Sequence, residues 1–158
     1  MDLVITDNQI LVKVSHVLFY SRILDGTYPD TSRIIPQNMK TEIILSTKEF
    51  LGAIERASLL ARDGKNNVVR LFTRPDGVVE LSSNTPEVGK VTEEVVPSSV
   101  DGEDVKISFN AKYMIDALRA VDSGEIRVEF TGAMSPFIIR PTEHDWILHL
   151  ILPVRTNQ

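Results

Sequence analysis

The sequence contains no cysteine, so disulfide bonds, thiolate metal sites and thiol nucleophiles are excluded. No apolar run approaches 18 residues, the length at which a stretch can cross a membrane as a helix. The first twenty residues lack a basic start followed by a long apolar segment, so we see no signal peptide. A chain without cysteine suits a reducing compartment. We therefore expect a soluble, cytoplasmic protein.

Recognisable catalytic motifs are missing as well. The sequence has no glycine-rich phosphate loop and no Gly-x-Ser-x-Gly elbow. His16, His144 and His149 do not have the spacing of metal ligands. Glu93 and Glu94 are neighbours on an expected strand and would point to opposite faces, which suits shared acid–base chemistry poorly. We expect no metal, no cofactor and no enzymatic activity, and a hydrolase using His144 or His149 is the least supported class.

What the sequence does contain is enough apolar material for a core. It has 158 residues, of which 42% are hydrophobic, so a folded domain plus part of another is expected rather than disorder. The net charge is −5. That balance argues against a protein that grips nucleic acid by broad electrostatic attraction, although it leaves room for a local basic patch.

A repeated order of elements dominates the chain. Residues 2–24 read as three strands, too few to cover their own faces and edges. After them, one strand, one helix and three strands occur twice, separated by a polar connector over 97–104. The helix caps are Ser46 or Thr47 in the first copy and Asn110 in the second. The expected strands cover 42–45, 68–74, 78–82 and 88–96 in the first copy and 106–109, 125–131, 136–140 and 146–152 in the second, with helices over 47–62 and 111–122.

The two helix starts align at an offset of 64 residues. Ser46-Thr47-Lys48-Glu49-Phe50 matches Asn110-Ala111-Lys112-Tyr113-Met114 in cap, lysine and apolar positions. The fold class that follows is α+β, a duplicated strand-helix-strand-strand-strand unit with two helices packed on antiparallel sheets.

Several apolar residues fall outside the expected core faces. Leu59 and Leu60 lie off the apolar stripe of their helix, under a neighbouring loop or in a subunit interface. Tyr113 is off its stripe too, either as a surface residue or as a contact for a partner. The segment 22–36 is more apolar than a solvated linker needs, so it is a rigid connector or a wall of a binding surface.

The C-terminal stretch 146–152 is apolar almost throughout, which predicts a strand covered on both faces. Pro153 ends that strand. The following Val154-Arg155 either protects an edge or completes a groove.

Four motifs together resemble one known family. They are Leu24-Asp25-Gly26-Thr27-Tyr28-Pro29-Asp30, Arg56-Ala57-Ser58-Leu59-Leu60, Phe109-Asn110-Ala111-Lys112-Tyr113 and Leu152-Pro153-Val154-Arg155. In order and over the whole chain, they resemble the bacterial DNA polymerase III beta subunit, the sliding clamp. That family forms a ring of two subunits, each of three duplicated domains, with helices lining the hole. The resemblance implies that 1–35 ends a second domain and that 36–158 is the third.

The resemblance also implies a function. Sliding clamps are not enzymes; they encircle duplex DNA and tether the replicative polymerase subunit, the clamp loader and repair polymerases through short linear motifs. The alternative is a stand-alone protein-interaction domain of the same fold without ring function. Asn66 stands at a rim position where other clamps carry an aromatic residue. The implied motif pocket takes Pro29, Arg33, Ile34, Tyr113, Met134, Pro136, Ile151, Leu152, Pro153, Val154 and Arg155.

Two further surfaces follow from the same resemblance. Leu59 and Leu60 would close the homodimer ring, with the strand 88–96 as the sheet edge that meets the neighbour. Lys48, Lys112 and Arg119 would face DNA, with weak contacts confined to phosphates because a sliding protein must not bind tightly.

Overall fold

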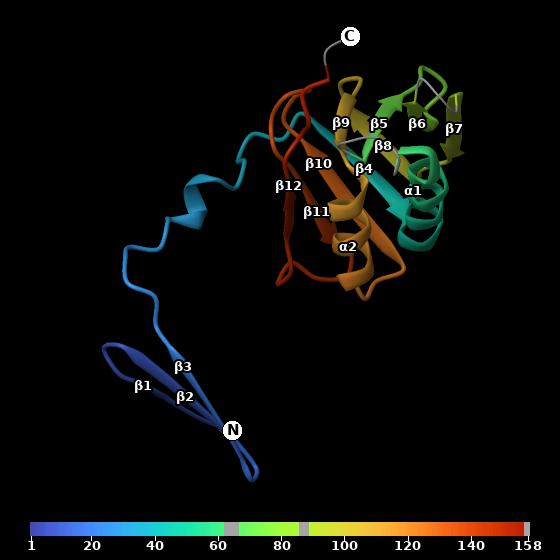
Figure 1. Ribbon diagram of the computed structural model, residues 1–158. Helices are drawn as coiled ribbons and strands as arrows, with labels where there is room; N and C mark the ends of the chain where they lie inside the picture. Colours follow the sequence, from blue (N-terminus) through green and yellow to red (C-terminus); the bar gives the residue numbers. More distant parts are fainter. Residues whose placement is uncertain (62–66, 86–88, 157–158) are drawn as a thin grey trace. The chain divides into compact units, whose positions relative to one another are not determined.

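The computed structural model describes residues 1–61, 67–85 and 89–156. Asn66 and the expected end of the first helix at residue 62 lie outside the described residues, as does the side chain of Leu60. The chain divides into two compact units, Met1–Ser32 and Arg33–Gln158 (Figure 1). A short 3-10 helix, η1 (Thr31–Arg33), spans the boundary between them.

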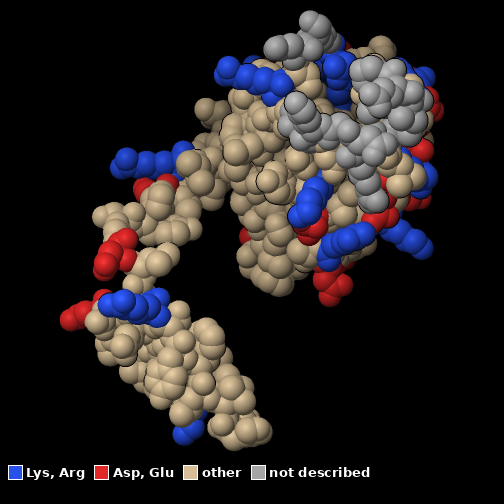
Figure 2. All heavy atoms as spheres, viewed as in Figure 1, with Lys and Arg blue, Asp and Glu red and all other residues tan. Residues whose placement is uncertain are grey.

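The first unit is a three-stranded antiparallel sheet of β1 (Asp2–Ile5), β2 (Gln9–Val14) and β3 (Val17–Arg22), in that order. The register places Leu3, Val12 and Phe19 opposite one another. Successive side chains alternate between faces, so one face of the sheet is apolar except for a single serine. No residue of these strands is buried, and the surface of the unit in Figure 2 is mostly uncharged. The sequence predicted that three strands are too few to cover their own faces, and Leu3 and Phe19 on the apolar face are exposed.

The described residues of the second unit contain the expected repeat, with two α-helices and two antiparallel sheets. The helices are α1 (Thr47–Ala61) and α2 (Ala111–Ala120). One sheet has the order β12-β11-β10-β4-β8 and the other the order β7-β6-β5-β9. The strands are β4 (Thr41–Ser46), β5 (Val68–Thr73), β6 (Val79–Thr85), β7 (Gly89–Val95), β8 (Ser99–Gly102), β9 (Lys106–Asn110), β10 (Glu125–Phe130), β11 (Phe137–Pro141) and β12 (His149–Ile151).

The two repeats exchange their first strands. β4 of the first repeat pairs with β10 of the second, and β9 of the second repeat pairs with β5 of the first. The first residue of each helix also bonds to the other repeat. The amide of Thr47 donates to Gly124 O at 3.0 Å, and that of Ala111 donates to Asn67 O at 2.9 Å. Each repeat is therefore incomplete alone, and the two form one unit.

Both predicted helix starts are confirmed. The amide of Glu49 donates to Ser46 Oγ at 3.4 Å, and that of Lys112 donates to Asn110 Oδ1 at 2.9 Å. These bonds satisfy amides that have no partner within the helix.

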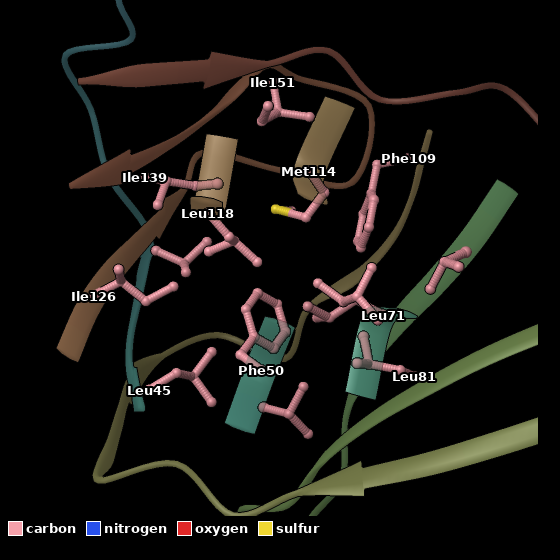
Figure 3. Packing of buried hydrophobic residues seen from close by; sticks show 14 of the residues in the cluster. Leu45, Phe50, Leu71, Leu81, Phe109, Met114, Leu118, Ile126, Ile139 and Ile151 are labelled. Atoms are coloured by element: carbon pink, nitrogen blue, oxygen red, sulfur yellow. The ribbon is translucent and has the colours of Figure 1, made fainter. Parts of the chain in front are cut away.

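A single hydrophobic core lies between the helices and both sheets (Figure 3). Phe50 of α1 and Met114 of α2 are fully buried in it, beside Phe109 of β9 and Ile126 of β10. The apolar stripe predicted for α1 is buried at Phe50, Ile54, Ala57 and Ala61, whereas Leu51, which the stripe also contained, is only partly buried. This core arranges α1 and α2 side by side against the inner faces of the sheets (Figure 1).

Two sequence predictions about the strands were wrong. The connector over 97–104 contains β8, which pairs with β4 from Thr41↔Gly102 to Ile44↔Ser99. The stretch 146–152 is not a strand covered on both faces: only His149–Ile151 is a strand, at a sheet edge, and Trp146 is 76% exposed. Both errors concern edge strands, which form when a partner edge is available rather than when their own sequence demands it.

Candidate functional site

The C-terminal segment, residues 152–155, lies against the open edge of β9. Pro153 forms a bridge with Phe109, and the amide of Val154 donates to Ser108 O at 2.7 Å. β8 has the same relation to β4 in the first repeat. The segment is therefore the counterpart of β8, and it carries the last predicted motif along the sheet edge beside the start of α2.

A first hollow of about 370 Å³, called here the apolar groove, lies between this segment and α2. Asn110 caps α2 and thereby fixes the first helical turn, from which Tyr113 projects into solvent with 63% of its area exposed. Leu152 is also exposed, at 65%. Such a surface suits an apolar or aromatic ligand group, with the tyrosine hydroxyl able to hydrogen-bond to it. The groove is lined by Asn110, Tyr113, Leu150, Ile151, Leu152, Pro153 and Val154.

A second hollow of about 440 Å³, called here the cationic hollow, shares Val154 with the first. The register pairs Arg70 of β5 with Ser108 of β9, and Lys106 lies two residues away on the same, outer face of that sheet. Met134 and Ala133, from the turn between β10 and β11, complete the rim. The hollow is lined by Arg70, Lys106, Ile107, Ser108, Ala133, Met134, Val154, Arg155 and Thr156.

The structure brings most of the predicted pocket residues together. Tyr113 and 151–154 line the apolar groove, while Met134, Val154 and Arg155 line the cationic hollow. Pro136, Arg33 and Ile34 belong to the second unit but line neither hollow, and Pro29 belongs to the first unit.

Sequence reasoning missed eight lining residues. They are Arg70, Lys106, Ile107, Ser108, Ala133 and Thr156 in the cationic hollow, and Leu150 and Asn110, the latter predicted as a helix cap, in the apolar groove. For Arg70 and Lys106 the available signal was the strand alternation, which places both on the outer face of neighbouring strands. The pairing of β5 with β9 was not readable from the sequence.

The helix face opposite the core mixes cations with carboxylates. Arg119 Nη2 lies 2.7 Å from Glu55 Oε1, and Lys112 Nζ lies 3.3 Å from Asp116 Oδ2. Glu55 and Arg119 are themselves 64 residues apart, so equivalent positions of the two repeats pair with each other. Lys48 is exposed and makes no ion pair with the described residues. A phosphate contact by Lys112 or Arg119 would compete with these internal partners, so it would be weak.

The end of α1 and the strand β7 form another surface. Leu59 is 58% exposed at the end of the helix. β7 is an edge strand that pairs, among the described residues, with β6 alone. Arg56 Nη2 bonds Glu93 Oε2 at 2.7 Å, which ties the helix to this strand. That hydrogen bond raises the pKa of Arg56 above its ordinary value.

Within the described residues, no three histidine, aspartate or glutamate side chains gather closely enough to hold a metal ion. In the same residues, neither helix is long and apolar enough to cross a membrane.

Comparison with known proteins gives consistent matches along the chain. The family model described as DNA polymerase III beta subunit, C-terminal domain, matches residues 32–155. The beta sliding clamps of Bacillus subtilis (strain 168) and Staphylococcus aureus are 58% and 53% identical to this chain over 156 residues. That alignment covers 99% of this chain and 41% of each relative. The crystal structure of the Bacillus subtilis clamp superposes with a TM-score of 0.93, at 58% identity, over 98% of this chain and 41% of that one.

Proposed function

This chain belongs to the DNA polymerase III beta subunit family, and from that membership we propose that it is the C-terminal part of a DNA sliding clamp. It spans 41% of the length of the curated relatives that it matches. In this proposal residues 1–35 end the second clamp domain and 36–158 form the third. The protein is a non-catalytic processivity factor of the bacterial replicative polymerase, and it works in the cytoplasm.

The proposed mechanism is topological. Two complete subunits form a ring around duplex DNA, so the ring stays on the DNA without holding any sequence. The helix face with Lys48, Lys112 and Arg119 faces the duplex. The internal ion pairs of Lys112 and Arg119 support this role, because cations that already have partners bind phosphates weakly. Weak contacts let the ring slide.

Ring closure in this proposal uses the surface at the end of α1. Leu59 and Leu60 contact the neighbouring subunit, and β7 presents its free edge to that subunit. The exposure of Leu59 supports the assignment, because an exposed leucine beside an unpaired strand edge suits a subunit contact.

Partner binding uses the surface beside the C-terminal segment. The replicative polymerase subunit, the clamp loader and repair polymerases insert short apolar motifs there. The observation that carries this proposal is the apolar groove, where an exposed tyrosine stands over an apolar lining beside a segment fixed by β9. Aromatic residues in small apolar grooves commonly dominate such interfaces. Arg33, Ile34 and Pro136 of the second unit also belong to the pocket in this proposal.

The test of this proposal is to delete the C-terminal residues that line the apolar groove. A fluorescein-labelled peptide ending in Gly-Leu-Gly-Leu-Phe is titrated by fluorescence anisotropy against the full chain and against a variant lacking residues 153–158. We expect measurable binding to the full chain and at least a tenfold weaker Kd for the variant, with circular dichroism showing that both are folded. Equal affinity for a folded truncated chain would remove the site assignment.

Ring function needs a separate measurement on the full-length gene product. A clamp has the mass of a dimer by light scattering and is retained on circular DNA but lost from linear DNA. A monomer that binds peptides but is not retained on circles would favour the stand-alone interaction domain.

A further inference from the structure

The cationic hollow has an unusual charge environment for this chain. The whole chain carries a net charge of −5, so carboxylates outnumber cations. Most described cations of the second unit pair with a carboxylate within 3.5 Å. Arg70, Lys106 and Arg155 make no ion pair with any described residue, and all three line this one hollow. The paired cations include Lys40, Arg56, Arg74, Lys112, Arg119, Arg127 and Arg140.

No acidic side chain is among the described residues that line the hollow. Three like charges around one concavity repel one another, and that repulsion is relieved when an anion enters. A chain with 22 acidic residues had many ways to neutralise this cluster internally. We therefore expect this cluster of cations to bind a negatively charged group of a ligand.

The apolar part of the lining indicates which kind of anion fits. Met134 and Val154 add apolar surface between the charges. A phosphate backbone would leave this surface uncovered, whereas a carboxylate side chain brings methylene groups to it. Because Val154 belongs to both hollows, a ligand in the apolar groove extends naturally into this one.

We propose that the cationic hollow recognises acidic residues that flank the apolar motif of a partner polypeptide. This inference rests on the proposed peptide-binding function of the apolar groove and adds a selection rule to it. Arg70 and Lys106 are the discriminating residues. They lie on the outer sheet face, away from the helix face, so they act on the flank of the peptide and not on its apolar anchor.

The experiment compares matched fluorescent peptides on the full chain. In one acidic peptide, Glu-Glu precedes Gly-Leu-Gly-Leu-Phe; in the other, a glycine and then Glu-Glu follow it. Each has a neutral control in which Gln-Gln replaces Glu-Glu. Each exposed ion pair contributes modestly, so we expect one acidic peptide to bind about 3- to 10-fold more tightly than its neutral control at about 0.05 M salt. The advantage should shrink at about 0.5 M salt because screening weakens it.

Variants assign the effect to the hollow. The double variant Arg70→Gln with Lys106→Gln should lose the acidic preference and keep its affinity for the neutral peptide. Lys13→Gln with Lys90→Gln removes the same charge from exposed positions on β2 and β7 that make no ion pair with described residues, and it should keep the preference. Loss of the preference in both double variants would overturn the inference, because net charge alone would then explain it.

The remaining outcomes separate the two proposals. If acidic and neutral peptides bind with equal Kd, the selection rule is wrong while the peptide-binding function stands. If no peptide binds, both are wrong. Labelled twelve-residue oligothymidine is the nucleic-acid probe: if it displaces the acidic peptide and its own binding is lost with Arg70→Gln and Lys106→Gln, the hollow is a phosphate site and the inference is overturned.

Discussion

Replacing Tyr113 by alanine is the sharpest test of the apolar groove, because the structure separates its effects on binding and on folding. Tyr113 stands in the first turn of α2 with 63% of its area exposed, and it makes no hydrogen bond with the described residues. Its removal should therefore change the free energy of unfolding by only about 0.5 kcal/mol.

The expected loss of affinity follows from the area that a ligand can cover. A tyrosine can bury about 150–250 Å², so the 63% that is exposed leaves about 100–150 Å² available to a ligand. At about 25 cal/mol per Å², full coverage would contribute about 3 kcal/mol, and half coverage about 1.5 kcal/mol. We therefore expect Tyr113→Ala to weaken peptide binding at least about tenfold.

The assay is fluorescence anisotropy with the Gly-Leu-Gly-Leu-Phe peptide, alongside a denaturant melt of each variant. Tyr113→Phe keeps the ring and should lose only about threefold, the cost of one hydrogen bond. Trp146→Ala is the matched control, since this residue is also an exposed aromatic side chain and lines neither hollow. An unchanged Kd for a folded Tyr113→Ala variant, or an equal loss for Trp146→Ala, would refute the reasoning.

Two stability predictions follow from the core and from one close backbone approach. Phe50→Ala removes a fully buried ring between the helices and sheets and should lower the free energy of unfolding by about 3–5 kcal/mol in a urea melt; a loss below about 1 kcal/mol would contradict the packing described. Gly102→Ala should cost more than Gly77→Ala in the same melt. Both glycines have positive φ, +115° and +83°, but a Cβ at Gly102 would lie 2.0 Å from Lys40 O, whereas nothing lies within 4 Å at Gly77. Equal costs would show that the contact of β8 with Lys40 relaxes freely.

The helices and the core were predictable from the sequence because their signals are local. Ser46 and Asn110 cap the helix starts, and the spacing of Phe50, Ile54 and Ala57 predicts the buried face of α1. The repeat itself was visible as a 64-residue offset. These features depend on residues a few positions apart, so no knowledge of partners was needed.

The edge strands were not predictable in the same way. Ser99–Gly102 has no apolar alternation, and it becomes β8 because the edge of β4 is open beside it. The stretch 146–152 reads as a core strand, yet most of it runs outside the sheet. In both cases the outcome depends on which neighbour offers free amides and carbonyls, and a local pattern does not contain that information.

The sequence alone determined the fold class, the duplication and the helix caps, because periodicity and capping chemistry act over short distances. The pocket residues at 151–155 were predicted from the family resemblance of the last motif. Only the tertiary structure decided that the repeats exchange their first strands and that the C-terminal segment lies on β9. It also decided that Arg70 and Lys106, 36 positions apart in the sequence, line one hollow with Arg155. The physical reason is that strand pairing joins distant segments through backbone hydrogen bonds, and those bonds are the same whatever the side chains.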